Sequence, residues 1–312
     1  MSKFSSVLLS YSTHHLLWVV LLIIIFYPGQ NGLQNIVITP HDPILLPSLS
    51  NLSPYPIKDG TAAPSLTANA VVVQDAIGRS MLYERNAQTP MLPASTTKLM
   101  TALVALDMYP DLGSELTVKV EDRTLGQTME LKKGEVLTAK SLLAGLLIRS
   151  GNDAALTLAN NSPHGYEGFV IAMNAKAKEL GLTGTKYKNP SGLEQYDHIT
   201  TARDLAILIT EVVKHEELTS LMLLPHLLVK DVTGAHVHAL ETTDQLLGVI
   251  PGIKAAKTGF TENAGECLVT YVERDGHAIV TVVLRSGDRF GETAKLIDWA
   301  YAHHTWLVPP EL

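Results

Sequence analysis

Short runs of β-branched and other apolar residues, interrupted by turn residues, occur near both ends of the folded part of the chain. They predict four strands, at 70–75, 79–84, 267–273 and 278–284. The first two strands are joined through Gly78, and the last two through the Asp-Gly pair at 275–276, which is typical of a tight hairpin turn. We therefore expect one β-hairpin at each end of this region.

Between the two hairpins, apolar residues recur at helical spacing. The predicted helices are 95–109, 138–148, 153–160, 166–180, 205–214 and 291–306. Pro110 ends the first helix, Gly181 caps the fourth, and Thr201 with Asp204 forms a capping box before the fifth. Terminal strands around central helices predict an α+β unit in which the strands pair into one antiparallel sheet.

The N-terminal residues carry a separate hydrophobic signal. Residues 7–27 have few polar side chains and are about long enough to cross a bilayer as one helix. Lys3 precedes them and the next basic residue is Lys58, so the positive-inside rule puts everything after Tyr27 outside the cytoplasm. The run does not end in small residues, so we expect a signal anchor at 1–30 that stays in the membrane, with a cleaved signal peptide as the alternative.

A proline-rich segment at 31–66 follows the hydrophobic run. It contains Pro40, Pro43, Pro47, Pro54, Pro56 and Pro64. Neither helical nor strand periodicity is sustained there, so we interpret it as a stiff linker, although its apolar residues could instead pack on the domain. The folded domain is expected at 67–308.

Composition narrows the possible functions. The 312 residues are 46% hydrophobic and 18% charged, which is typical of a globular protein, and the net charge of −7 gives no reason to expect a nucleic-acid partner. Cys267 is the only cysteine, so neither an internal disulfide nor a thiolate metal cluster can form. The twelve histidines do not have the spacing of a zinc site, and we expect no metal and no cofactor.

Ser95 and Lys98 begin the first predicted helix, three residues apart. This spacing places the hydroxyl and the amine on the same helical face. A serine needs a neighbouring base to become nucleophilic, and a lysine removed from water can be that base. The motif alone is too short to establish an active site.

Two further motifs strengthen the interpretation. Ser150-Gly-Asn152 lies in a break between two predicted helices, and Lys257-Thr-Gly259 lies where a strand enters a loop. Ser150 could pass a proton to the leaving group, and Asn152 could bind a substrate amide. Lys257 would favour a neutral Lys98, and with Thr258 it would bind a carboxylate.

The main chain would complete the site. The backbone amide of Ser95 could stabilise an oxyanion, and Gly259 would let a ligand backbone approach the strand closely.

The three motifs and their neighbours resemble one family. The related stretches are 93–98, 131–135, 150–155, 173–182, 189–193, 201–205 and 257–261. In these stretches the chain is similar to the low-molecular-mass penicillin-binding proteins, which are serine D-Ala-D-Ala carboxypeptidases of the penicillin-binding protein 5 type. The resemblance implies a β-lactamase/transpeptidase-like fold, with a five-stranded antiparallel sheet flanked by helices.

The resemblance also implies roles and partners. Ser95 would be acylated, Lys98 would be the base, and the backbone amide of Phe260 would be the second oxyanion donor. The substrate would be a peptidoglycan stem peptide, with β-lactams as covalent inhibitors, and the protein would act in the bacterial cell envelope. One departure from the family is Lys254-Ala-Ala256, where many relatives have Asp-Gly before Lys-Thr-Gly, and alternation along the strand predicts that Lys254 points outward.

Other functions on the same fold remain open. A D,D-endopeptidase or transpeptidase would use the same three motifs. A common serine β-lactamase needs a glutamate to activate the deacylating water, whereas this chain has Asn189-Pro-Ser-Gly-Leu193 in that region. A β-lactam-binding sensor, which belongs to another functional class, would be expected to carry several membrane spans or an effector domain.

Overall fold

The structure is a computed structural model that describes residue 18 and residues 54–119 and 125–307. Apart from residue 18, the expected signal anchor at 1–30 lies outside the described residues and stays a prediction. Within the described part of the chain, no helix is both long enough and apolar enough to span a membrane.

A five-stranded antiparallel sheet forms the centre of the domain. Its strands, in spatial order, are β3 (Met81–Arg85), β2 (Ala70–Asp75), β10 (His277–Ser286), β9 (Gly265–Arg274) and β8 (Ile253–Thr261). The predicted hairpins are confirmed, and β2 pairs with β10, so the two ends of the region meet in one sheet. Asp275 and Gly276 both have positive φ, as the predicted tight turn requires.

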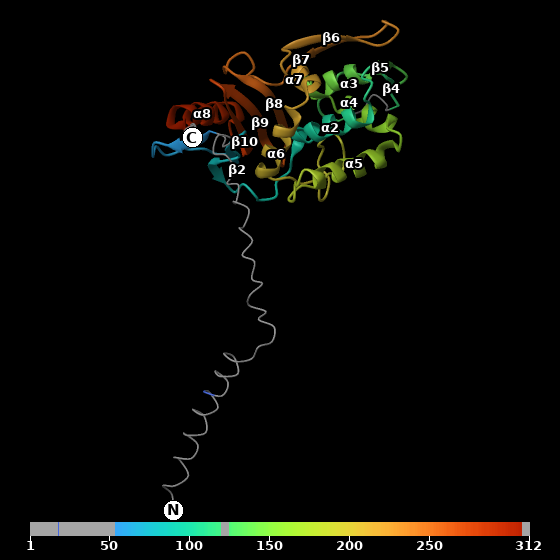
Figure 1. Ribbon diagram of the computed structural model, residues 1–312. Coiled ribbons are helices and arrows are strands. Elements are labelled where there is room, and N and C mark those ends of the chain that lie inside the picture. The colour runs from blue at the N-terminus through green and yellow to red at the C-terminus, as the bar shows by residue number, and fades with distance from the viewer. Residues whose placement is uncertain (1–17, 19–53, 120–124, 308–312) are drawn as a thin grey trace, which may run out of the picture. The chain divides into compact units, whose positions relative to one another are not determined.

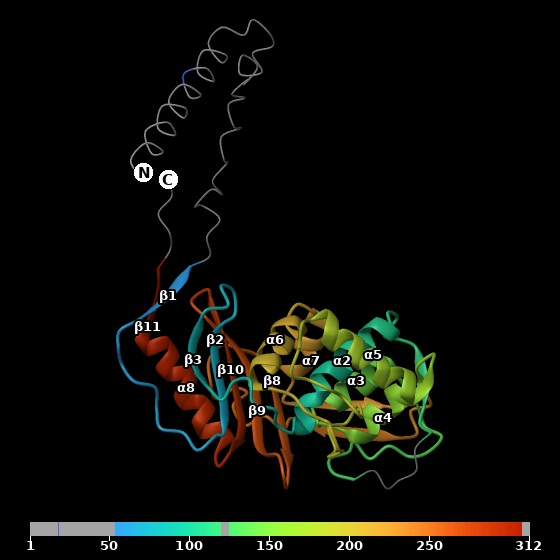
Figure 2. The same ribbon diagram turned by 90° about the horizontal axis from the view of Figure 1, so that it is seen from below.

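Both faces of this sheet are covered by helices, as Figure 2 shows. On β2, Val71 and Val73 belong to the apolar cluster that includes α8 (Arg289–His303). The alternate residues Ala70 and Val72 belong to the larger cluster under α6 (Ala202–Val212). A strand buried on both faces is apolar at every position, which explains the uninterrupted Val71-Val-Val73 run.

The remaining helices lie beside the sheet, on the side of α6 (Figure 1). They are α2 (Lys98–Met108), α3 (Ala139–Leu147), α4 (Asn152–Asn161), α5 (Gly165–Glu179) and α7 (Glu216–Met222). The predicted cap at Thr201 is confirmed, because its side chain accepts a hydrogen bond from the Asp204 amide. The helix expected to begin at Ser95 begins at Lys98 instead, since Ala94–Thr97 form the 3₁₀ turn η2.

Three two-stranded sheets were not predicted. They pair β1 (Tyr55–Lys58) with β11 (His304–Leu307), β4 (Glu115–Thr117) with β5 (Val136–Thr138), and β6 (His226–Lys230) with β7 (Val237–Glu241). β1 lies inside the segment expected to be a linker. Its partner β11 also contacts the central sheet, because Trp306 donates a hydrogen bond to Asp75 of β2 (2.9 Å). The paired part of the chain therefore starts before the expected hairpin, and the domain limits themselves stay predictions.

Candidate active site

The η2 turn carries Ser95 to the edge of the sheet. Thr96 fixes the turn by donating its hydroxyl proton to the Pro93 carbonyl (2.6 Å), and Ala94 adopts a positive φ of 46°. The turn packs against Gly259 of β8, where a Cβ atom would lie 3.2 Å from the Ser95 nitrogen. Gly259 also lines the cavity beside Ser95, so the ligand approach predicted there stays a prediction.

The amine of Lys98 is completely buried and lies among three oxygen atoms. Its Nζ is 3.0 Å from Ser95 Oγ, 2.6 Å from Asn152 Oδ1 and 2.6 Å from the Ser191 carbonyl. The amide and carbonyl oxygens can only accept, so a neutral amine uses its two N–H groups on them. Its lone pair is then left facing the Ser95 hydroxyl, which is the arrangement a general base requires.

The environment of Lys98 favours this neutral form. Burial lowers the pKa of the Lys98 amine well below its ordinary value of 10.5, and the charge of Lys257 lowers it further, whereas Asp153 opposes the shift. These are the two causes that the sequence predicted. A lysine with a depressed pKa can accept a proton near neutral pH, which a solvent-exposed lysine does poorly.

The second buried lysine, Lys257, lies on the side of the site formed by Ser150 and Thr258. Its Nζ donates to Ser150 Oγ (2.9 Å) and to the Thr258 carbonyl (3.1 Å). Burial and then the charge of Arg289 lower the pKa of Lys257 to about 7, against an opposing effect of Asp244. Ser150 has a φ of +61°, and the left-handed backbone at the break between α3 and α4 carries this hydroxyl to the lysine.

The Asn152 side chain links Lys98 to the backbone at Leu125. Its Oδ1 accepts from Lys98, and its Nδ2 donates to the Leu125 carbonyl (2.6 Å), so both partners require the same orientation of the amide. An amide nitrogen carries two protons, which leaves one N–H for a substrate carbonyl. The substrate contact expected of Asn152 thus stays a prediction that this geometry allows.

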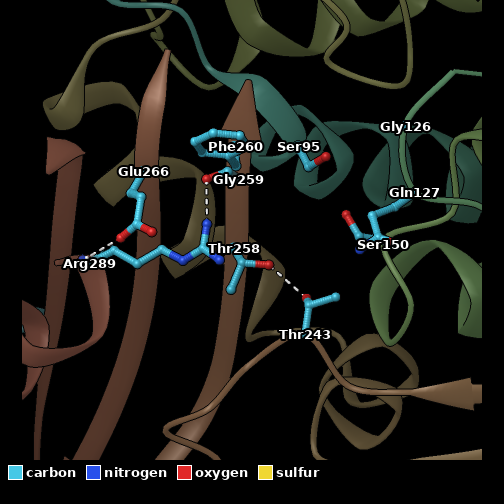
Figure 3. Close-up of a pocket in the computed structure, with 10 residues that line it drawn as sticks. All are labelled: Ser95, Gly126, Gln127, Ser150, Thr243, Thr258, Gly259, Phe260, Glu266 and Arg289. Carbon is cyan, nitrogen blue, oxygen red and sulfur yellow. Dashed lines mark hydrogen bonds between the residues drawn. The ribbon is translucent and has the colours of Figure 1, made fainter. Parts of the chain in front are cut away.

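Ser95 lies where two cavities meet. One cavity, of about 540 Å³, reaches toward Thr243, Thr258 and Arg289 (Figure 3). The other, of about 690 Å³, reaches toward Asn152 and Leu193. Both are lined by Ser95, Gly126, Gln127 and Phe260. Ser95 therefore stands between two cavities, an arrangement that would suit cleavage of a bond between two substrate residues.

Three residues of this site were not predicted. The first is Arg289, whose Nη1 donates to the Gly259 carbonyl (2.9 Å) and whose guanidinium borders the cavity (Figure 3). The second is Thr243, whose hydroxyl lies 2.6 Å from the hydroxyl of Thr258. The third is Ser191, which acts through its carbonyl. Arg289 follows Lys257 by an entire hairpin, so no local spacing indicates it.

Two further residues named from the sequence lie at the cleft and away from it. Phe260 borders both cavities and is 61% exposed, and its backbone role as an oxyanion donor stays a prediction. Lys254 is exposed, with its amine 3.8 Å from Glu273 on the neighbouring strand, so it points outward as predicted. Within the described ranges, no group of three or more His, Cys, Asp and Glu side chains is placed to hold a metal ion.

Comparison with known proteins places this geometry in a family. Residues 58–287 match the D-alanyl-D-alanine carboxypeptidase family, peptidase family S11. The chain is 32% identical over 248 residues to the D-alanyl-D-alanine carboxypeptidase DacF of Bacillus subtilis, a match that covers 76% of this chain and 62% of DacF. It is also 32% identical over 258 residues to a D-alanyl-D-alanine endopeptidase of Pseudomonas aeruginosa, with 82% of each chain covered.

A solved structure agrees with the fold. Penicillin-binding protein D2 of Listeria monocytogenes, in its ampicillin-bound form, superposes with a TM-score of 0.69 at 31% identity and covers 77% of this chain and 100% of that one. The expected fold, an antiparallel five-stranded sheet flanked by helices, is thereby confirmed as that of the penicillin-binding proteins. The chain belongs to the D-alanyl-D-alanine carboxypeptidase family of serine peptidases.

Proposed function

We propose that this protein is a serine D-Ala-D-Ala carboxypeptidase that removes the terminal D-Ala from peptidoglycan stem pentapeptides. The observation that carries the proposal is the Lys98 amine, whose two acceptor partners leave its lone pair facing Ser95 Oγ at 3.0 Å. Family membership supplies the reaction, and the two cavities beside Ser95 supply room for both sides of the scissile bond.

The first half-reaction forms an acyl-enzyme. Lys98 takes the hydroxyl proton while Ser95 Oγ attacks the carbonyl carbon of the penultimate D-Ala. The backbone amides of Ser95 and Phe260 are the proposed donors to the oxyanion. The C–N bond then breaks, and the leaving amine of D-Ala takes up the proton from Lys98 directly or through Ser150.

The leaving residue is held by its carboxylate. Thr258 and Arg289 line the end of the cleft that would receive it, and the buried Lys257 lies next to this end, 2.9 Å from Ser150 Oγ. Charge-assisted hydrogen bonds to a carboxylate are among the stronger polar contacts in proteins. In the second half-reaction, water attacks the ester carbonyl, Lys98 accepts a proton from that water, and Ser95 Oγ leaves with a proton. A β-lactam would acylate Ser95 in the same way as the peptide.

The place of action follows from the substrate. Peptidoglycan lies in the bacterial cell envelope, where we propose that the catalytic domain works, held at the membrane by the hydrophobic segment at 1–30. Fractionation of cells with N-terminal sequencing of the mature protein tests the anchor. A mature chain that starts near Asn31 would refute it.

The function is tested by measuring free D-Ala released from diacetyl-Lys-D-Ala-D-Ala, with labelled penicillin as a second reporter. We expect release and labelling by the wild type and loss of both in Ser95→Ala. Absence of release by the wild type, or equal release by Ser95→Ala, would overturn the proposal. A cross-linked stem-peptide dimer is assayed in parallel because an endopeptidase relative matches over 82% of both chains, and preferential cleavage of that dimer would favour the endopeptidase alternative.

A further inference from the structure

The segment from Asn189 to His198 packs against the turn that carries Ser95 and against the start of α2. The Ser191 carbonyl accepts from Lys98 (2.6 Å), and the Pro190 carbonyl accepts from the Thr101 hydroxyl one turn further along α2 (2.6 Å). Ser191 also lines the cavity of about 690 Å³, whereas Pro190 lines neither cavity. The segment therefore borders the cleft at Ser191 and supports the turn and the helix beside it.

A third contact involves a buried histidine. His198 is 1% exposed, and its Nε2 lies 2.9 Å from the hydroxyl oxygen of Thr97, which is fully buried. Its Nδ1 lies 3.1 Å from the backbone nitrogen of Lys188. A backbone N–H can only donate, so Nδ1 is the unprotonated nitrogen. Nε2 therefore carries the proton of the neutral ring and donates it to Thr97.

The same tautomer agrees with the surroundings of the ring. Burial, and then the charge of Lys188, lower the pKa of His198 to about 4, so the imidazole is neutral at the pH at which Lys98 can act as a base. Tyr187 packs edge-on against the ring at a centroid distance of 5.9 Å. The ring is thus fixed in place and has one N–H to offer.

Thr97 is the residue through which this N–H can influence the chemistry. It stands between Ser95 and Lys98 in the η2 turn, and a Cβ on Gly192 would lie 1.9 Å from the Ala94 carbonyl oxygen and 3.0 Å from Thr97 Oγ1. The segment and the turn are therefore in direct contact on both sides of the nucleophile. A shift of Thr97 would carry Ser95 with it.

We propose that His198 is a positioning residue that holds the nucleophile turn through Thr97 and keeps Ser95 Oγ within reach of the Lys98 amine. This inference rests on the proposed acylation of Ser95. Neither His198 nor Thr97 lines either cavity, so the pair does not touch the substrate. Loss of the hydrogen bond between His198 and Thr97 is expected to slow acylation of Ser95 and to leave substrate binding unchanged.

Two amide variants separate the two hydrogen bonds of the ring. The longer His198→Gln can keep a donor for Thr97 but loses the acceptor for the Lys188 amide, whereas the shorter His198→Asn can keep that acceptor but loses the donor. Misplacing reacting groups by about 1 Å can cost on the order of 100-fold in rate. We expect penicillin acylation to fall by about 10- to 100-fold in His198→Asn and to be restored in large part in His198→Gln.

Thr97→Val removes the acceptor with little change in volume and tests the same contact without altering the ring. It should lower the rate constant of acylation about as much as His198→Asn, and the double variant should be no slower than either single one. For D-Ala release, kcat should fall while KM stays constant. Tyr109→Phe is the control, because it deletes another buried hydrogen bond of the same helix, from Tyr109 Oη to the Leu158 carbonyl (2.7 Å), far from the cleft.

The outcomes distinguish this inference from the proposed function. If the wild type does not form an acyl-enzyme, the proposed function fails. If the wild type is acylated and Thr97→Val reacts equally fast, the positioning role alone is refuted. It is also refuted if His198→Gln and His198→Asn are equally impaired, or if the losses multiply in the double variant, since either result would indicate general loss of packing.

Discussion

Gly192→Ala would place a methyl group against the backbone that precedes the nucleophile. The added Cβ would lie 1.9 Å from the Ala94 carbonyl oxygen and 2.5 Å from its carbonyl carbon, whereas real Cβ contacts essentially never fall below 3.0 Å. One side must therefore move by about 1 Å, the difference between 3.0 and 1.9 Å. Both contacts are with backbone, so no flexible side chain can absorb the movement.

The energetic cost has two parts. Gly192 has a φ of +88°, and an alanine in this left-handed region costs about 1–2 kcal/mol. Overpacking a close contact adds about 1–3 kcal/mol. Alanine also lowers the conformational entropy of the unfolded chain, which offsets about 0.4–1 kcal/mol of this destabilisation. We therefore expect Gly192→Ala to lower the free energy of unfolding by about 1–5 kcal/mol.

Gly134→Ala provides a matched control. Gly134 has a similar φ of +93°, but a Cβ there would meet no atom within 4 Å, so Gly134→Ala is destabilised by backbone strain alone. The two variants should differ by about 1–3 kcal/mol in unfolding, which corresponds to roughly 2–12 °C in Tm for a domain of this size. Urea and thermal unfolding followed by circular dichroism measure the difference.

Activity gives a second comparison. The carbonyl that must move belongs to the residue before Ser95, so Gly192→Ala should also slow labelling by penicillin, while Gly134→Ala should label like the wild type. Equal stabilities of the two variants would show that the loop can move away from the turn at little cost. That result would refute the tight support inferred for the nucleophile.

Two further predictions concern the carboxylate end of the cleft. In the proposed function the protonated form of Lys257 binds the substrate carboxylate, so kcat/KM for D-Ala release should fall as pH rises through about 7, the pKa of Lys257. Asp244 raises that pKa, so Asp244→Asn should move this fall to lower pH, and an unchanged pH profile would count against the proposed role. Arg289→Lys keeps the charge but loses the planar fork, and because hydrogen bonds to charged groups contribute about 1.5–3 kcal/mol, kcat/KM for the free-acid substrate should fall by roughly 10- to 150-fold. A peptide with an amidated C-terminus should be affected far less, and equal losses on both substrates would contradict a carboxylate contact.

Much of the fold could be predicted because local patterns agreed with the final structure. The two hairpins carry their own turn residues, and the helices are bounded by Pro110, Gly181 and Thr201. The position of the candidate site was also indicated by the sequence, since Ser95 and Ser150 stand where predicted elements start or end. Lys257 is predicted where a strand enters a loop, but it lies inside β8, because the pairing with β9 continues to Thr261. The sheet and the helices bring the three motifs together in the cleft.

The missed features depend on tertiary contacts. Ser191 contributes a backbone carbonyl, which every residue has, so no side chain identifies it. Arg289 reaches the cleft only because β9 and β10 return the chain to the same end of the sheet, where α8 begins. β1 and β11 have four residues each, too few to show a period, and they are stable as strands because they pair with each other.

β8 is an edge strand, since among the described strands its hydrogen-bonded neighbour in the sheet is β9 alone. Unpaired edges invite other extended chains, and proteins usually block them. Here the η2 turn packs against β8, and the stretch from Thr258 to Thr261 borders the cavities. We expect a peptide that enters the cleft to add to this edge through its main chain, as a sixth strand. Selectivity then depends on its charged terminus more than on its side chains, and an inhibitor would need an extended backbone before it needs a matched set of substituents.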